Sequence, residues 1–277
     1  MFRNILVHIP SERRVRPVLD VAVALTIARR SHLDAIAIGY ESMSAAGMIV
    51  EGGGAAVAAV MGAEQVRAQE RADAALAVFE IEAKLAKIAY GTRTLVAVPA
   101  EAGQTISTLA RLYDMTIVLQ PESSRPSYDN EIPQQILFNS GGPLLVVPYI
   151  HKGPLDAHHV GIAWDGSRLA ARAVHDAMPF LMGARAVTVI AINEQASEAS
   201  SDQIVAHLGR RGIAARAQQL ITDRSDVQGA ILSIAAESNM GLLVMGGYGH
   251  SRLQERILGG VTRSMFECMT VPVLMSH

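Results

Sequence analysis

The sequence predicts an α/β protein of two tandem doubly wound domains, each with a parallel sheet of five strands. Apolar strand-like runs alternate with helical patterns, and the whole alternation occurs twice in the same order. Half of the residues are hydrophobic but only 4% are aromatic, a composition typical of sheets covered on both faces. The polar stretch 151–159 is broken by Gly and Pro. We therefore expect domains at residues 1–150 and 160–277, with 151–159 as the linker.

The first half begins with an expected strand at residues 4–10. A helix is expected at 17–30, because Leu19, Val23 and Ile27 recur at helical spacing. The other elements expected in this half are strands at 33–39, 92–98, 115–119 and 144–147, and helices at 63–89 and 105–113.

The second half repeats this order. Strands are expected at 160–164, 186–192, 214–220, 242–245 and 271–275, and helices at 167–182, 200–211, 227–238 and 261–268. The two halves are also locally similar in sequence, since 114–119 resembles 239–244 and 142–148 resembles 271–275. We interpret the halves as diverged copies of one domain.

Composition narrows the classes of partner and compartment. A formal net charge of -2 gives no reason to expect nucleic acid or an anionic membrane as a partner. Cys268 is the sole cysteine, which fits a reducing compartment, and we expect it to be a buried structural thiol. The chain begins with a strand pattern rather than a secretory signal, and the apolar stretch 45–63 contains Glu51 and several glycines. We expect a cytoplasmic protein that does not enter membranes.

The most informative motif is the glycine-rich stretch 244–262. It follows the apolar run 241–245, which is typical of a buried parallel strand. Its glycines are Gly246, Gly247, Gly249, Gly259 and Gly260. Such glycines let backbone amides approach an anion, and a helix that follows them would present further free amides. The motif predicts a phosphate cradle; the alternative is a strand-to-helix connection whose glycines only permit tight packing.

At these residues the chain resembles the universal stress protein family, in its tandem two-domain form. Gly246, Gly249 and Gly259 match the glycine spacing of that family, and Gly260 stands where a Ser or Thr is usual. Residues 163–167, Ala-Trp-Asp-Gly-Ser, are similar to the family's first strand and the turn after it. The resemblance implies domains of the adenine nucleotide α-hydrolase-like kind and a role as a sensor or regulator in the stress response.

The resemblance also implies the residues of a nucleotide site in the second half. Asp165, with Ala163 and Trp164, would line the nucleoside, and Ile192 would wall the adenine. The base wall and phosphate loop would be formed by Met245, Gly246, Gly249, Gly259, Gly260 and Val261. His250 and Thr262 are further candidates for phosphate contacts, as are Arg252 and Arg256, for which solvent-facing positions are an equal alternative. The expected ligand is ATP, or AMP or ADP, with Mg²⁺ near Asp165 as an open possibility.

The glycine at position 260 departs from the family pattern. It removes a side-chain hydrogen bond to phosphate, worth on the order of 1–3 kcal/mol when one partner is charged. We expect phosphate binding to persist but to weaken, in favour of AMP or ADP over ATP. Thr262 would compensate in part if its hydroxyl faces the loop.

The first half departs much further from the family pattern. Pro10 stands where the second half has Asp165, and prolines interrupt the segment 120–133. Because proline has no amide hydrogen to donate, this loop is a poor phosphate cradle. We expect no nucleotide there by the family's mode, and a role in pairing with the second half. Family members dimerise through their last strand, so 144–147 and 271–275 predict an intramolecular pseudo-dimer. A homodimer and an unidentified protein partner are left open.

No catalytic constellation is recognisable in the sequence, so an enzyme is not the leading hypothesis. Two alternatives to a nucleotide-binding regulator are a slow ATPase and a scaffold whose sites have both decayed. We expect His8 to be a core histidine with its polar atoms satisfied. The histidines of the linker, His151, His158 and His159, are interpreted as solvated rather than as metal ligands, since no Cys or paired carboxylate completes a site.

Overall fold

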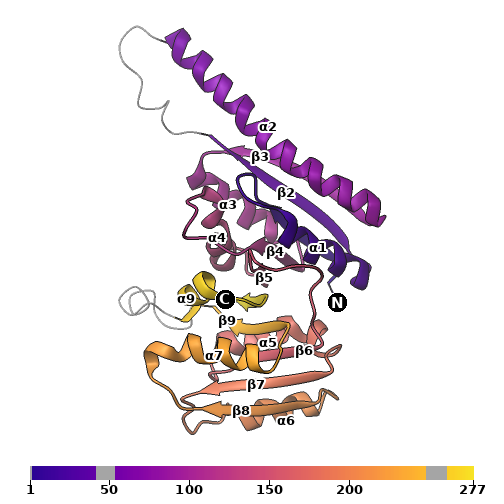
Figure 1. The fold of residues 1–277 in the computed structure, drawn as a ribbon, viewed down its shortest axis with the longest axis vertical. Helices are drawn as coiled ribbons and strands as arrows, with labels where there is room; N and C mark the ends of the chain where they lie inside the picture. Colours follow the sequence, from indigo (N-terminus) through magenta and orange to yellow (C-terminus); the bar gives the residue numbers. More distant parts are fainter. Residues whose placement is uncertain (1, 42–53, 248–260) are drawn as a thin grey trace.

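The computed structural model describes residues 2–41, 54–247 and 261–277. In these residues one ten-stranded sheet runs through the molecule in the order β3-β2-β1-β4-β5-β10-β9-β6-β7-β8, with helices on both faces (Figure 1). Nearly all neighbouring strands are parallel, which confirms the predicted α/β class. Each half of the chain contributes one half of the sheet.

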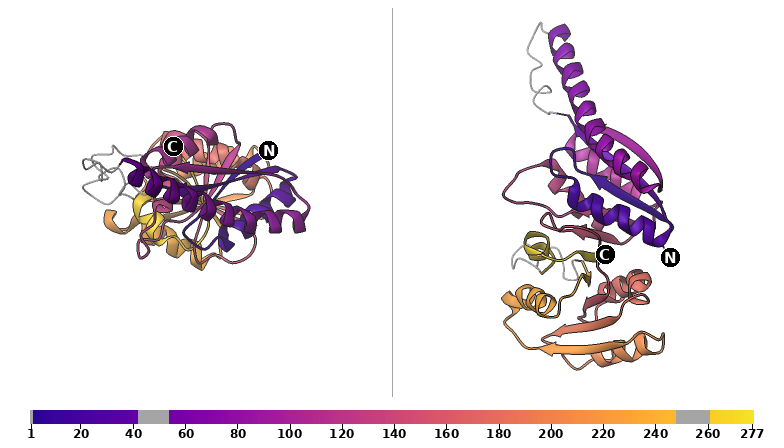
Figure 2. Two further views of the ribbon diagram at one scale, coloured as in Figure 1. Left: turned by 90° about the horizontal axis from the view of Figure 1, so that it is seen from above. Right: turned by 45° about the vertical axis from the view of Figure 1, so that its right-hand side comes forward.

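The first half supplies one side of this sheet. Its elements are β1 (Asn4–Ile9), α1 (Arg16–Arg29), β2 (His32–Tyr40), α2 (Gly54–Ala86), β3 (Ala89–Ala97), α3 (Pro99–Ala110), β4 (Met115–Leu119), η2 (Tyr128–Asn130), α4 (Ile132–Asn139) and β5 (Leu144–Val147). One end of α2 extends beyond the sheet, as the right-hand view of Figure 2 shows. Among the described residues, neither this helix nor any other is long and apolar enough to cross a membrane.

The second half supplies the other side. Its elements are β6 (His159–Ala163), α5 (Arg168–Leu181), β7 (Ala186–Ile192), α6 (Ser201–Gly209), β8 (Ala215–Leu220), η3 (Arg224–Asp226), α7 (Val227–Glu237), β9 (Leu242–Gly246), α9 (Val261–Cys268) and β10 (Val273–Ser276).

The two halves are joined by their last strands. β5 and β10 pair antiparallel at the centre of the sheet, with Leu145 opposite Leu274. The strand order is therefore equivalent when counted from either edge, as expected for two similar domains that pair through equivalent strands. This is the intramolecular pairing predicted from 144–147 and 271–275. Apolar strands that would otherwise be exposed edges are thus buried in the middle of the sheet.

Each face of the sheet carries helices from both halves. One hydrophobic cluster contains residues of α1, α2, α5 and α6, and the other contains residues of α3, α4, α7 and α9. Because neighbouring residues of a strand point to opposite faces, inner strands such as β1, β4 and β9 contribute side chains to both clusters and are mostly apolar.

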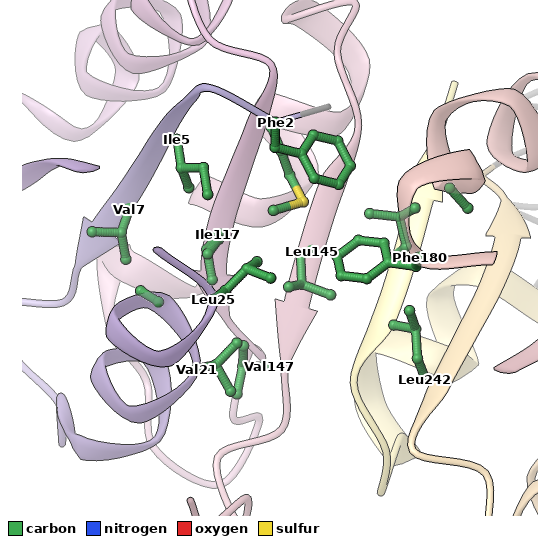
Figure 3. Close-up of a cluster of buried hydrophobic side chains, with 14 of the residues drawn as sticks. Phe2, Ile5, Val7, Val21, Leu25, Ile117, Leu145, Val147, Phe180 and Leu242 are labelled. Carbon is green, nitrogen blue, oxygen red and sulfur yellow. The ribbon is translucent and has the colours of Figure 1, made fainter. Parts of the chain in front are cut away.

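The first of these clusters continues across the junction of the halves. Phe180 of α5 is 1% exposed, and its ring centroid lies 5.3 Å from that of Phe2 (Figure 3). The guanidinium of Arg29 lies 5.3 Å from the centroid of the Phe180 ring. Leu145 and Leu242 belong to the same cluster, so one continuous core spans both halves.

Some sequence-based boundaries were wrong. The helix expected at 105–113 is α3 and begins at Pro99, because a proline is tolerated in a helix's first turn, where its missing N–H costs nothing. Helix α4 was not predicted, since the prolines of 120–133 were interpreted as a loop although Pro133 lies in the first turn of that helix. Cys268 is exposed rather than buried, because α9 turns Met265 and Phe266 to the core instead.

We expect Phe180→Ala to weaken the junction of the halves. Truncation of a buried phenylalanine typically costs about 3–5 kcal/mol of unfolding free energy. Urea unfolding can be followed by circular dichroism of the whole chain and by fluorescence of Trp164, the sole tryptophan, which lies in the second half. The two probes are expected to separate in this variant because the second half loses the contact that couples it to the first.

Leu112→Ala is the control, since Leu112 is 76% exposed and its truncation should change the unfolding free energy by no more than about 0.5 kcal/mol. Equal effects of the two substitutions would contradict the role given to Phe180.

Candidate functional site

Each half has a point where the order of its strands reverses. β1 lies between β2 and β4, and β6 lies between β7 and β9. In doubly wound sheets, ligands bind in the crevice outside the carboxyl ends of the two strands at such a point. The candidate sites are therefore the carboxyl ends of β6 and β9 in the second half, and those of β1 and β4 in the first.

In the second half, a tight turn after β6 presents an exposed carboxylate. Asp165 Oδ1 accepts a hydrogen bond of 2.9 Å from the backbone N–H of Ser167. Ser167 in turn caps α5, because its Oγ accepts from the N–H of Ala170. Gly166 between them has a φ of 72°, which suits glycine best. The Asp-Gly-Ser sequence thus fixes Asp165 at the carboxyl end of β6.

Next to this carboxylate, three of the expected residues lie on one face of the sheet. Ala163 pairs in register with Met245 of β9. Ala163, Met245 and Ile192, at the end of β7, all contact the cluster that also holds α7 and α9. Ala163 and Ile192 are only partly buried, so this apolar surface is not fully covered by the described residues.

Trp164 does not join this group. Its side chain lies in the opposite hydrophobic cluster, and its Nε1–H donates a 2.8 Å hydrogen bond to the carbonyl of Ala199. The alternation of side chains along an extended chain explains this, because Ala163 and Trp164 must point to opposite faces.

The first two glycines of the loop have packing roles. A Cβ at Gly246 would lie 2.7 Å from the backbone N of Ala170, in the first turn of α5. A Cβ at Gly247 would lie 2.8 Å from a methyl group of Leu137, which belongs to α4 of the first half. For these two positions the structure supports the packing interpretation of the motif.

The rest of the glycine loop is only partly described. Val261, at the start of α9, is partly buried, and Thr262 is buried. The remaining candidates lie outside the described residues: Gly249, His250, Arg252, Arg256, Gly259 and Gly260.

The start of the loop is held against the first half of the chain. The N–H of Gly247 donates to the carbonyl of Ser276, and the ring of His277 lies 2.9 Å from the carbonyl of Gly247. The same ring packs edge-on against Phe138 of α4, with centroids 4.9 Å apart. The carboxyl end of β9 thus lies at the junction of the halves.

At the corresponding point of the first half, side chains of the chain itself occupy the strand ends. Asp129 is 3% exposed; its carboxylate accepts from the hydroxyl of Tyr40, at the end of β2, and from the N–H of Glu12, after β1. The imidazole Nε2 of His8, near the end of β1, lies 3.5 Å from the same carboxylate. We call these residues, His8, Tyr40 and Asp129, the buried polar cluster.

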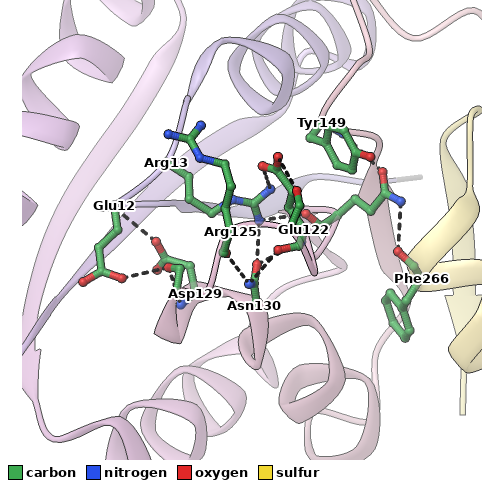
Figure 4. Close-up of polar contacts among 11 residues, drawn as sticks. Glu12, Arg13, Glu122, Arg125, Asp129, Asn130, Tyr149 and Phe266 are labelled. Carbon is green, nitrogen blue, oxygen red and sulfur yellow. Dashed lines mark hydrogen bonds and ion pairs between the residues drawn. The ribbon is translucent and has the colours of Figure 1, made fainter.

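Arg13 fastens the segment after β4 over this point (Figure 4). Its guanidinium donates to the carbonyl of Gln120 at 2.8 Å and to Oδ1 of Asn130 at 3.0 Å, and it pairs with Glu122 at 3.3 Å. The N–H of Glu122 also donates to Asn130. The segment that would hold phosphate in a glycine loop is instead tied down by its own side chains.

Burial shifts the ionisation of the buried polar cluster. Burial, and to a lesser degree the charge of Arg13, lower the pKa of His8 from 6.5 to about 3, so this imidazole is neutral at pH 7. Burial raises the pKa of Asp129 from 3.8 to about 6, against the hydrogen bond from Tyr40. His8 is thus a core residue as expected, but its Nε2 has no hydrogen-bond partner among the described residues, contrary to the expectation.

Sequence reasoning missed Tyr40, Asp129 and Arg13. Each belongs to a different loop or strand end, and nothing in their spacing indicates that they meet.

The linker histidines have separate contacts: His159 bonds the carbonyl of Ser238 and the hydroxyl of Thr188, and His151 bonds the carbonyl of Gly153. Among the described residues, no group of His, Cys, Asp and Glu is arranged to hold a metal ion.

We expect Asp129→Asn to make the protein more sensitive to acid. Below its ordinary pKa of 6.5, His8 takes up a proton only on unfolding, so acidification destabilises the fold. Asp129 opposes this between pH 3.8 and about 6, because there the folded state holds the proton and the unfolded state does not. Removing that carboxyl should steepen the loss of unfolding free energy on acidification by up to about 1.4 kcal/mol per pH unit.

The measurement is urea unfolding of both proteins at a series of pH values across this window. The slopes, rather than the absolute stabilities, are compared, because the substitution also changes hydrogen bonds. Parallel slopes would contradict a raised pKa for Asp129.

Comparison with known proteins agrees with this architecture. Residues 157–277 match the universal stress protein family. A universal stress protein from Archaeoglobus fulgidus has the same fold over 98% of this chain and 95% of its own, at a TM-score of 0.69 and 16% sequence identity. A putative universal stress protein from Pseudomonas aeruginosa is similar over 99% of this chain and 93% of its own, at a TM-score of 0.60 and 16% identity.

A functionally unknown protein from Pseudomonas aeruginosa is similar over 99% of this chain and 92% of its own, with a TM-score of 0.56 and 16% identity. No curated protein matches the chain. At these identities the solved structures show the fold alone, whereas the family match extends over the second half and the candidate site in it. Residues 157–277 thus form a domain of the universal stress protein family.

Proposed function

We propose that the second half binds an adenine nucleotide at the carboxyl ends of β6 and β9 and that the protein acts as a nucleotide-dependent regulator. One observation carries the proposal: an exposed, turn-fixed carboxylate, Asp165, stands at the reversal of strand order beside a partly uncovered apolar surface. A nucleoside needs both of these features, since its base is apolar and its ribose hydroxyls donate hydrogen bonds.

Different residues are proposed to contact the base, the ribose and the phosphates. Ala163, Ile192 and Met245 are proposed to contact the base. Oδ2 of Asp165 accepts from the ribose, because Oδ1 is engaged by the turn. The phosphates, with or without Mg²⁺, are assigned to Gly249, His250, Gly259 and Gly260 and to the first turn of α9, by resemblance to the family. ATP, ADP and AMP are all candidates.

Regulation is proposed to pass through the junction of the halves. Gly247, the last described residue before the loop, packs against Leu137 and bonds His277, which packs against Phe138. A nucleotide bound at the loop would change the environment of these contacts with α4. In this proposal residues 1–150 form a domain without a nucleotide, residues 151–159 are the linker, and residues 160–277 form the nucleotide-binding domain.

The first test compares two aspartates in matched turns. Asp156 is exposed, and its Oδ1 accepts a 2.9 Å hydrogen bond from the N–H two residues later, as that of Asp165 does. Asp156 precedes β6, however, at the opposite end of the sheet. Asp165→Asn keeps the turn but loses the acceptor for the ribose, so the Kd for ATP, ADP or AMP should rise by roughly tenfold. Asp156→Asn should leave it unchanged.

Isothermal titration calorimetry on the full chain measures these constants. Failure of the native chain to bind any of the three nucleotides at millimolar concentration would overturn the proposal. An unchanged Kd in Asp165→Asn would overturn the assignment of the ribose contact. Phosphate release measured on the same samples tests the slow-ATPase alternative.

The second test concerns the position where a hydroxyl residue is usual in the family. Gly260→Ser supplies a donor for phosphate, and a charge-assisted hydrogen bond should lower the Kd for ATP by roughly tenfold. The Kd for adenosine, which has no phosphate, should not change and serves as the internal control. An equal gain for both ligands would place residue 260 away from the phosphates.

A further inference from the structure

The first half contains an open cavity of about 710 Å³ on the α1 side of the sheet. It lies between the loop that enters α1, the segment after β4 and the segment after β5, and Leu119 and Pro17 are among its lining residues. This volume falls within the range of about 300–1,000 Å³ that is usual for small-molecule sites. The buried polar cluster is not part of its lining.

The charged residues of the lining are predominantly basic. Together with His151 they are Arg13, Arg14, Arg16, Asp20, Glu122, Arg125 and Lys152. Both acidic side chains are already engaged. Asp20 pairs with Arg16 at 2.7 Å and accepts from the N–H of Gly153, and Glu122 pairs with Arg13 and accepts from Ser124.

Three cationic side chains of the lining are not paired with these two carboxylates. Arg14, Arg125 and Lys152 are exposed, they come from the three segments that enclose the cavity, and none of them makes an ion pair with another described residue. The cavity therefore carries a surplus of positive charge around a common space. Such an arrangement suits a compact anion with several negative charges.

Two further features favour an anion. The side chain of Arg13, a lining residue, is 4% exposed, and its Nε–H has no hydrogen-bond partner among the described residues. Helix α1 begins beside it without a side-chain cap, so the positive end of the helix dipole is not neutralised there. Tyr149 and Ile150 are exposed at the same cavity and offer apolar surface to an organic part of the ligand.

We propose that this cavity binds a small anion that carries phosphate groups, held by Arg14, Arg125 and Lys152. This site is separate from the nucleotide site of the second half and gives the first half a ligand of its own. It uses side-chain cations rather than a backbone cradle, which is consistent with the prolines of the segment after β4.

Inorganic pyrophosphate is the probe, titrated calorimetrically into the full chain. The triple variant Arg14→Gln, Arg125→Gln, Lys152→Gln removes charge without breaking a described side-chain contact, and the Kd should rise about tenfold or more. The control is Arg185→Gln, Arg210→Gln, Arg211→Gln, which removes the same number of exposed charges from the second half. The control should bind pyrophosphate as the native chain does.

Protection of lysine side chains from acylation tests the position of the ligand by a second method. The chain has Lys152 in the cavity and Lys84 and Lys87 on or just after α2. Pyrophosphate should slow the acylation of Lys152, followed by mass spectrometry of peptides, and should leave Lys87 unaffected. This readout does not depend on any variant or on the nucleotide site.

The proposal is overturned if the native chain fails to bind pyrophosphate at millimolar concentration, if both triple variants weaken it equally, or if Lys152 is not protected. Citrate that binds as tightly as pyrophosphate would overturn the assignment to phosphate. The two sites are distinguished by ATP binding that is unchanged in the cavity variant but weakened in Asp165→Asn. Either proposal can therefore fail without the other.

Discussion

The antiparallel pairing of β5 with β10 is the interaction on which the rest of the molecule depends. Both strands are fully buried and apolar except for Ser276, and each would be an exposed edge if its half stood alone. Their pairing makes one sheet of two and places the carboxyl ends of the two sets of strands at opposite sides of the junction. As a result each candidate site lies against the other half: Gly247 meets α4, and Gln120 donates a 2.9 Å hydrogen bond to the carbonyl of Phe266 in α9 (Figure 4).

The carboxyl end of the first strand has a different environment in each half. In the second half, the turn after β6 leaves a carboxylate exposed to solvent. In the first half, Pro10 replaces that aspartate, and Asp129 returns from the segment after β4 to bond Tyr40 within the protein. An exposed carboxylate in the second half thus corresponds to a buried one in the first half that stabilises the fold. The first half would then bind through surface cations, and the protein would present two unlike sites on one framework.

The fold could be predicted because its signals are local and repeated. Continuous apolar runs such as 144–147 and 242–245 mark buried parallel strands, and their order fixes the class. The turn that holds Asp165 could be predicted because Asp-Gly-Ser is contiguous in sequence. The buried polar cluster and the cavity could not be predicted, since His8, Tyr40 and Asp129 meet only through the tertiary structure. Trp164 was grouped with Ala163 through the family resemblance, although neighbours on an extended chain face opposite ways. Helix α4 was missed because Pro133 was interpreted as a breaker rather than as a first-turn residue.

The central claim is that the two halves have diverged, so that one of them binds an adenine nucleotide through the strand-end site and the other does not. Native mass spectrometry of the full chain with ATP counts the bound nucleotides directly. One nucleotide per chain, with lower occupancy in Asp165→Asn and unchanged occupancy in the cavity variant, is the result we predict. Two equivalent nucleotides per chain, or none, would contradict the divergence of the halves.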